Sequence, residues 1–311
     1  MRYTGIIILL VFCLILLLLT DCKVNTADSE IATEEPETEN PQKWSGLTGF
    51  SCWYSYIESY GGVWLANGFT EIRGLYDYQD TTNINASKAA VIAGNAAGLK
   101  AIWGVHAGST GITSANWQDF RVAILAAAQW AQDNGVYEFQ IGNEEELHVD
   151  GTTMTVAQII INLKNVATDV QEIFTNGNVS YSCSTMYAVE NWIPAGKGDI
   201  DILAFNVYKG SYRTYTDEWK TKITTIVNAF GVDGTYITEF NLSSNDIDDY
   251  STDEAVQTGG LAEIIEYIKA SGIERALFYT WHDNADNSLG VVKADGTYRL
   301  LWDQALLNSG P

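Results

Sequence analysis

Basic residues are scarce in this chain of 311 residues. Lysine and arginine together number 17 against 39 aspartates and glutamates, which gives a formal net charge of −22 at pH 7. A protein that binds nucleic acid or an anionic membrane surface needs a basic face, because the phosphate groups must be neutralised. The charge balance argues against both functions and suits an extracellular protein that acts on a neutral polymer.

Cysteine is also scarce, with four in the whole chain. Cys13 and Cys22 belong to the N-terminal segment, so only Cys52 and Cys183 remain for the rest of the protein. No spacing typical of a metal-binding motif is present. The sequence therefore implies no metal and no cofactor.

Polar residues are missing from Ile6–Leu19, which follow Arg2 near the N-terminus. This run has the length of a secretory signal and is short for a membrane span. We expect residues 1–22 to be an export leader. A cysteine at position 22 resembles the lipid-attachment site of a bacterial lipoprotein signal, although Asp21 departs from the small residue usual before it. The alternative is an uncleaved signal anchor, and both versions place the protein outside the cell, tethered to the membrane only through this anchor.

Apolar residues are nearly absent from residues 23–43, which carry six acidic residues and two prolines. Such a segment cannot bury a core, and we expect it to be a disordered acidic linker. Residues 44–311 remain for a single folded domain. Their number is close to the roughly 250 residues of a barrel built from eight strand–helix units.

Short apolar runs alternate with longer amphipathic stretches throughout residues 44–311, a pattern typical of a parallel sheet with crossover helices. The expected strands are Leu47–Trp53, Phe69–Tyr76, Leu99–His106, Val136–Ile141, Val179–Ser184, Ile200–Asn206, Thr235–Phe240 and Arg275–Trp281. The expected helices include Ile84–Ala97, Asn116–Asn134, Thr155–Thr175, Thr216–Phe230 and Asp253–Ala270, whereas those after the first and fifth strands are poorly marked. Eight such strands predict an α/β fold, a single-domain (β/α)8 or TIM barrel. Cys52 and Cys183 would lie on opposite sides of it, so we expect two buried free thiols.

Two carboxylate motifs end strands of this predicted barrel. Ile141-Gly142-Asn143-Glu144 ends the fourth strand, and Thr238-Glu239-Phe240 ends the seventh. The active site of a TIM barrel lies at the carboxyl ends of its strands. Two carboxylates that face each other there can cleave a glycosidic bond, one as acid and base and the other as nucleophile.

Glu144 is followed by Glu145 and Glu146, and only one of the three can face Glu239 because successive side chains point in different directions. The motif favours Glu144. A different interpretation is that all three form a solvated acidic lip. For Glu239 the alternative is a purely structural ion pair with Arg73.

At these residues the chain resembles the clan A retaining glycoside hydrolases, barrel enzymes that act on β-linked polysaccharides. The resemblance extends from about Gly46 to Asp303. In that clan an Asn-Glu pair ends the fourth strand and a lone glutamate ends the seventh, which matches the two motifs above. The resemblance implies the following roles: Glu144 as acid/base, Glu239 as nucleophile, Asn143 as partner of the sugar 2-hydroxyl, Arg73 as the arginine that keeps the nucleophile ionised, and Tyr208 as a tyrosine that contacts the nucleophile.

Four further residues near strand ends are candidates for substrate binding. Trp281 resembles the aromatic floor that the clan places beneath the sugar after the eighth strand, and His106 matches a third-strand histidine of some members. Trp53 could stack on a sugar face. Asp283 could bind hydroxyl groups or merely turn the chain, and the sequence leaves that open.

These residues predict a monomeric endo-acting hydrolase of β-linked polysaccharide or oligosaccharide that retains the anomeric configuration, with β-glucan favoured. Glu71-Ile72-Arg73 looks most like the β-1,3-glucanase-type families, whereas His106 and Trp281 favour the cellulase and mannanase type. A transglycosylase that uses the same site and a catalytically silent cell-surface glycan-binding barrel remain alternatives.

Overall fold

A computed structural model describes most of the domain expected from the sequence. The described residues are 44–52, 54–108, 111–149, 153–209, 218–242, 254–283 and 290–303. The expected leader and linker lie outside them. Within these ranges, no helix has the length and apolar character needed to cross a membrane.

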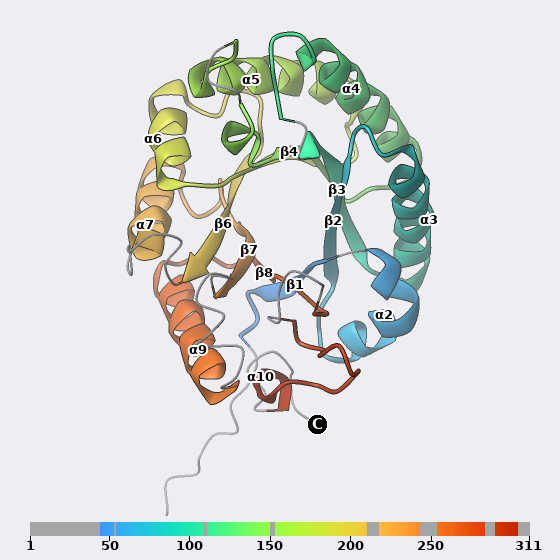
Figure 1. Cartoon of the computed structure of the whole chain (residues 1–311), viewed down its shortest axis with the longest axis vertical. Coiled ribbons are helices and arrows are strands. Elements are labelled where there is room, and N and C mark those ends of the chain that lie inside the picture. The colour runs from blue at the N-terminus through green and yellow to red at the C-terminus, as the bar shows by residue number, and fades with distance from the viewer. Residues whose placement is uncertain are drawn as a thin grey trace, which may run out of the picture. The chain divides into compact units, whose positions relative to one another are not determined.

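Eight parallel strands close into a barrel in the order in which they occur along the chain (Figure 1). The strands are β1 (Leu47–Ser51), β2 (Glu71–Asp77), β3 (Lys100–His106), β4 (Glu138–Asn143), β5 (Asn178–Cys183), β6 (Ile202–Lys209), β7 (Ile237–Leu242) and β8 (Ala276–Phe278). Every neighbouring pair is parallel, and β8 closes the barrel on β1. The predicted (β/α)8 fold is confirmed.

Helices surround the strands as an outer ring (Figure 1). They are α2 (Ile57–Ala66), α3 (Thr81–Ala97), α4 (Trp117–Asp133), α5 (Val156–Ile173), α6 (Met186–Ala195), α7 (Glu218–Phe230), α9 (Glu254–Ala270) and the short α10 (Leu300–Asp303). The helices that the sequence marked poorly are α2 and α6. Both are short, and each contains residues unfavourable in a helix, Gly61 and Gly62 in α2 and Pro194 in α6.

Local sequence signals fix where two of the longer helices begin. The Asp80 carboxylate accepts hydrogen bonds from the backbone N–H groups of Thr82 (3.1 Å) and Asn83 (3.0 Å) at the start of α3. Thr155 and Gln158 form a capping box at the start of α5. These caps satisfy N–H groups that have no partner within the helix.

The apolar core lies mainly between the strands and the surrounding helices, whereas much of the barrel interior is polar. At the amino-terminal end of the strands, Arg275 binds Glu71 (Nε–Oε2, 2.9 Å) and Glu138 (Nη1–Oε2, 2.6 Å). The hydroxyl of Tyr236 donates to the second oxygen of Glu138 at 2.6 Å. The ion pairs tie β8 to β2 and β4 from inside the barrel. Cys52 and Cys183 are buried and free, which confirms the expectation of two thiols.

Candidate active site

The chain turns sharply where β4 ends. Glu144, the residue after Asn143, has φ 59° and ψ 27°, and it is the one described residue other than glycine with a positive φ. Residues with a Cβ rarely adopt this left-handed conformation. The backbone N–H of Glu144 donates to Ser182 O on β5 at 2.8 Å, which holds the turn against the neighbouring strand. The turn interrupts the alternation of the strand and separates Glu144 from the two glutamates that follow.

Glu145 and Glu146 are buried and serve as anchors for neighbouring backbone. The Glu145 carboxylate accepts from the N–H of Ala107, after β3, at 3.1 Å, and burial raises its pKa to about 8. Glu146 accepts from the N–H (2.7 Å) and the hydroxyl (3.1 Å) of Ser184, after β5, and from the Tyr181 hydroxyl. The interpretation of the run as a solvated acidic lip is therefore wrong.

Glu144 keeps a partly exposed side chain and one well-defined partner. The Asn206 amide nitrogen donates to its Oε1 at 2.8 Å. Burial and, to a smaller extent, the charge of Glu239 raise the pKa of Glu144, the Asn206 hydrogen bond lowers it, and the net pKa is about 7. A carboxyl group with this pKa carries a proton for a large part of the time near neutral pH.

Asn206 is a residue of the site that the sequence analysis missed. Its Oδ1 accepts from Thr238 Oγ1 (2.7 Å) and Ser182 Oγ (3.1 Å), so its nitrogen must point toward Glu144. Asn206 on β6 is also the register partner of Glu239 on β7, which brings the two glutamates to adjacent places at the barrel mouth. Its position two residues before Tyr208, on the same side of a strand, was the available signal.

Glu239 is held by a cation and a hydroxyl group. Arg73 Nη1 lies 2.6 Å from Glu239 Oε1, and the Tyr208 hydroxyl donates to Oε2. Both donors stabilise a carboxylate anion. Arg73 itself is 2% exposed, so it is fixed by burial as well as by its partners. Its remaining hydrogen bonds go to Gln140 Oε1 (2.7 Å), Ser51 Oγ (2.8 Å) and Asn143 Oδ1 (2.8 Å).

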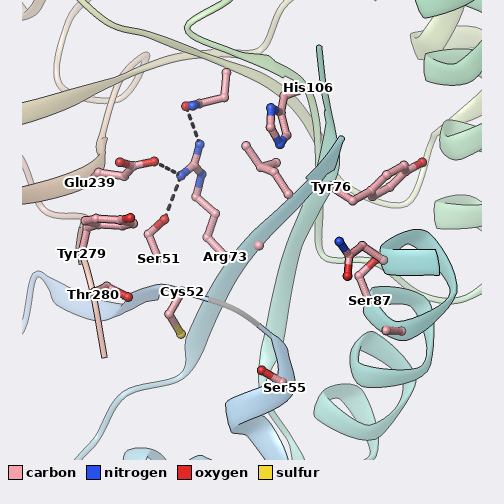
Figure 2. A pocket seen from close by; sticks show the side chains of 15 residues that line it. Ser51, Cys52, Ser55, Arg73, Tyr76, Ser87, His106, Glu239, Tyr279 and Thr280 are labelled. Atoms are coloured by element: carbon pink, nitrogen blue, oxygen red, sulfur yellow. Dashed lines mark hydrogen bonds and ion pairs between the residues drawn. The ribbon is translucent and has the colours of Figure 1, made fainter. Parts of the chain in front are cut away.

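A cavity of about 580 Å³ opens beside these residues. Glu239, Arg73, Asn143 and Tyr279 line it, and Figure 2 shows Arg73 between Glu239 and His106, with Tyr279 on the same side as Glu239. Its volume is within the range of small-ligand sites. His106 Nδ1 accepts from the Gly108 N–H at 2.9 Å, and burial lowers the pKa of this imidazole. The neutral ring therefore carries its hydrogen on Nε2.

Trp281 lies away from this cavity, and the prediction that it forms the floor beneath a sugar is corrected. Its side chain is fully buried and packs on Phe50 (ring centroids 4.8 Å apart) and on Trp64 of α2 (5.4 Å). The reason is that β8 ends at Phe278, three residues earlier than expected, so Trp281 lies beyond the strand and not at its end. Tyr279 is the aromatic residue after β8 that lines the cavity.

Asp283 was also a candidate for substrate binding, but both of its carboxylate oxygens are bound by other residues of the chain. Its Oδ2 pairs with Arg299 Nη2 at 2.7 Å, and its Oδ1 accepts from the Gly290 N–H at 2.8 Å. Both bonds fasten the segment after β8, so of the two roles left open by the sequence the structure favours turning the chain. The remaining candidate, Trp53, lies outside the described residues.

The structure thus brings together five of the predicted residues around one cavity or its immediate partners: Arg73, His106, Asn143, Tyr208 and Glu239. Glu144 adjoins them through the backbone of Asn143. No group of three or more metal-ligating side chains is found in the part of the chain that the structure describes. The expectation of no metal and no cofactor stays a prediction.

No family model and no curated protein sequence match the chain. Solved structures do resemble its barrel. They include the exo-β-1,4-mannosidase Op5Man5 from Opitutaceae bacterium strain TAV5 (13% identity, TM-score 0.61, covering 86% of this chain) and the catalytic domain of the major endoglucanase from Xanthomonas campestris pv. campestris (15%, 0.57, 84% of this chain and 88% of that one). A third is the GH53 catalytic domain from Ignisphaera aggregans (14%, 0.64, 85% of this chain and 96% of that one).

The chain spans 61% of the length of the mannosidase. At these identities the similarity establishes a shared fold. The recognition of a glycosidase-type barrel in the sequence is therefore confirmed at the level of the fold.

Proposed function

We propose that this protein is a glycoside hydrolase that cleaves β-linked polysaccharide, with β-glucan favoured, and retains the anomeric configuration. The observation that carries the proposal is the contrast between two carboxyl groups at the barrel mouth. Glu239 is bound by Arg73 at 2.6 Å and by the Tyr208 hydroxyl, whereas burial raises the pKa of Glu144 to about 7. Pairs of carboxyl groups whose environments differ in this way divide the roles of nucleophile and acid.

In the first step Glu239 attacks the anomeric carbon while Glu144 gives its proton to the glycosidic oxygen. The glycosidic bond breaks, the leaving sugar departs as an alcohol, and a glycosyl ester forms on Glu239. Arg73 holds the oxygen Oε1, so the carboxylate is presented in one orientation. Asn143 accepts from Arg73 through Oδ1, and its amide nitrogen, which donates to no other described residue, can donate to the 2-hydroxyl of the sugar.

In the second step Glu144, now a carboxylate, removes a proton from water. The hydroxide attacks the anomeric carbon from the face that the leaving sugar vacated, and the ester bond to Glu239 breaks. Two inversions give net retention. Asn206, fixed by two hydroxyl groups, keeps Glu144 in place through both steps.

The endo mode, the β-glucan preference and the tether at Cys22 belong to the same proposal. The uncharged lining contributed by Ser51, His106 and Tyr279 suits a neutral sugar, and one similar structure is that of an endoglucanase. Export and attachment to the membrane rest on residues 1–22 alone.

The deciding experiment measures release of reducing sugar from β-1,3-glucan, β-1,4-glucan, mixed-linkage glucan, mannan and xylan. The wild-type protein is compared with Glu144→Gln, Glu239→Gln and, as a control, the exposed Glu190→Gln on α6. We expect activity on one polymer class that both active-site variants lose and the control keeps. A folded protein that binds one of these polymers and releases nothing from any of them would favour the glycan-binding alternative.

The stereochemistry is tested separately. The anomeric proton signals of the first product are followed by NMR before mutarotation. A β-configured product supports the double displacement, and an α-configured product rules it out. Products longer than the substrate would identify the transglycosylase alternative.

A further inference from the structure

A lysine is buried behind the active site. Lys222 on α7 is 9% exposed and lies on the same helix as the buried Trp219 and Ile223. Its ammonium group donates to the backbone carbonyl of Ser184 and, at 2.8 Å, to that of Asn206. No carboxylate of the described residues forms an ion pair with it. A buried ammonium without a carboxylate partner is costly, so its position behind the active site calls for a reason beyond packing.

The two carbonyl groups belong to residues that also form hydrogen bonds with two of the three consecutive glutamates after β4. Ser184, after β5, donates through its N–H and its hydroxyl to Glu146. Asn206, on β6, donates through its side chain to Glu144. Lys222 is therefore connected to Glu146 through Ser184 and to Glu144 through Asn206. In each case it contacts the backbone of the residue that binds the glutamate.

We propose that Lys222 is a positioning residue for the acid/base Glu144. It holds Asn206 against that carboxyl group and supplies a positive charge on the side of Glu144 away from Glu239's partner Arg73. The inference rests on the proposed function, and the experiment below separates the failure of one from the failure of the other.

Of the charged groups that face Glu144, Lys222 is the one that favours its anion without being paired to another carboxylate among the described residues. The anions are Glu239 from β7 and Glu146 from the same turn, and both raise the pKa of Glu144. Lys222 from α7 lowers it. Burial lowers the pKa of the Lys222 ammonium group itself, and the nearby carboxylates of Glu144, Glu218 and Glu146 oppose that shift. Arg73 from β2 is already paired with Glu239. Of the other titratable groups nearby, Glu145 is held by backbone N–H groups, while burial raises the pKa values of Tyr208, Tyr181 and Cys183 and keeps them neutral.

The test replaces Lys222 with methionine, which has similar length and no charge, and records kcat/KM against pH. Loss of a positive charge near Glu144 disfavours its anion, so the basic limb of the profile should move upward by roughly 0.5 pH unit or more. Lys222→Arg keeps the charge and should leave the limb near its wild-type position. The matched control is Lys220→Met on the same helix, because Lys220 pairs with Glu263 on the surface at 2.8 Å.

An unchanged or lowered basic limb in a folded Lys222→Met protein would overturn the inference, because a residue with a purely structural role reduces stability without moving the limb. If the methionine variant does not fold, Lys222→Gln replaces it; its amide can still donate to a carbonyl, and the same readings apply.

The inference can also be tested without turnover. In protein labelled with ¹³C at the glutamate carboxyl carbons, the Glu144 signal is assigned by its loss in Glu144→Gln and is titrated by NMR. Lys222→Met should raise the titration midpoint of this signal, and an unmoved midpoint would reject the role of Lys222. If the wild-type protein is inactive on every glycan and yet the midpoint moves, the proposed function fails while the electrostatic role of Lys222 stands.

Discussion

The run of three glutamates after β4 shows how one backbone conformation assigns different chemistry to identical side chains. Glu144 adopts a left-handed conformation, whose cost is of order 1–3 kcal/mol for a residue with a Cβ. The turn sends Glu145 and Glu146 into the barrel wall, where N–H and O–H groups satisfy them. Glu144 is left at the mouth with a raised pKa. A strained backbone conformation of this kind persists only where the surrounding interactions hold it, and such residues cluster at functional sites.

The pH dependence of activity follows from Glu144. The first chemical step needs its protonated form, and burial raises its pKa to about 7. We expect kcat/KM to decline as the pH rises through about 7, as measured from initial rates between pH 4 and 9. A rate that stays constant up to pH 9 would contradict the assignment of Glu144 as the acid.

The stability of the protein should depend on the same group. The folded-state pKa of about 7 lies above the ordinary value of 4.5, so between these values the native state binds more protons than the unfolded state. The contribution of Glu144 to the free energy of unfolding is therefore fully present below about pH 4.5 and is lost as the pH rises through about 7. Replacing Glu144 with glutamine removes this loss, and we expect a gain of roughly 1 kcal/mol or more at pH 8 and none at pH 4.

Urea unfolding at the two pH values measures this effect. Glu190→Gln, on the exposed face of α6, serves as the control and should stay within about 0.5 kcal/mol of wild type at both. An equal gain for Glu144→Gln at pH 4 and pH 8 would mean that ionisation is not its cause.

At the scale of elements, the barrel depends on close approach between strands. Gly104 on β3 pairs with Gln140 on β4, and a Cβ built on Gly104 would lie 1.9 Å from the Gln140 carbonyl oxygen. A side chain at this position would force the two strands apart. Because Gln140 also accepts the Nε hydrogen bond of Arg73, the packing of this strand pair is connected to the active site.

Gly104→Ala should destabilise the protein by roughly 2–3 kcal/mol or more and also lower activity. The matched control is Gly62→Ala in α2, where a Cβ would meet no atom within 4 Å. Alanine is favoured over glycine inside a helix, so this variant should gain roughly 0.5–1 kcal/mol. Thermal unfolding of the two variants beside wild type gives the comparison, and equal effects would contradict the steric explanation.

At the scale of the whole molecule, closure of the barrel joins residues that are far apart in the chain. Arg275 beside β8 reaches Glu71 on β2 and Glu138 on β4 inside the barrel, and the two carboxylates are 5% and 0% exposed. This cluster lies at the end of the strands opposite the active site. It stabilises the closed barrel without contacting the groups that do the chemistry.

Arg275→Met leaves two buried carboxylates without their cation and should cost roughly 3–5 kcal/mol. Arg121→Met breaks the Arg121–Asp169 pair, whose side chains are 34% and 41% exposed, and should cost no more than about 1 kcal/mol. Urea unfolding near neutral pH distinguishes them. A small loss for Arg275→Met would show that the base of the barrel is held by other contacts.

The local pattern of the chain was enough to predict the architecture. Strand count, barrel topology and the two glutamate motifs could be read from apolar periodicity and from the residues that end each run, because a buried parallel strand imposes that pattern locally. The limits of the strands were less well determined. β8 is shorter than expected and ends at Phe278, and this error alone moved the predicted aromatic contact from Tyr279 to Trp281.

The sequence by itself determined the barrel and the two strands, the fourth and the seventh, that end in carboxylates, since both depend on neighbours along the chain. Only the tertiary structure decided which of three adjacent glutamates reaches the mouth, because that depends on the sign of one φ angle. It also revealed Asn206 and Lys222, whose roles arise from strand register and from a helix that packs behind it. Contacts between elements distant in sequence carry no local signal, so they become visible only once the barrel has closed.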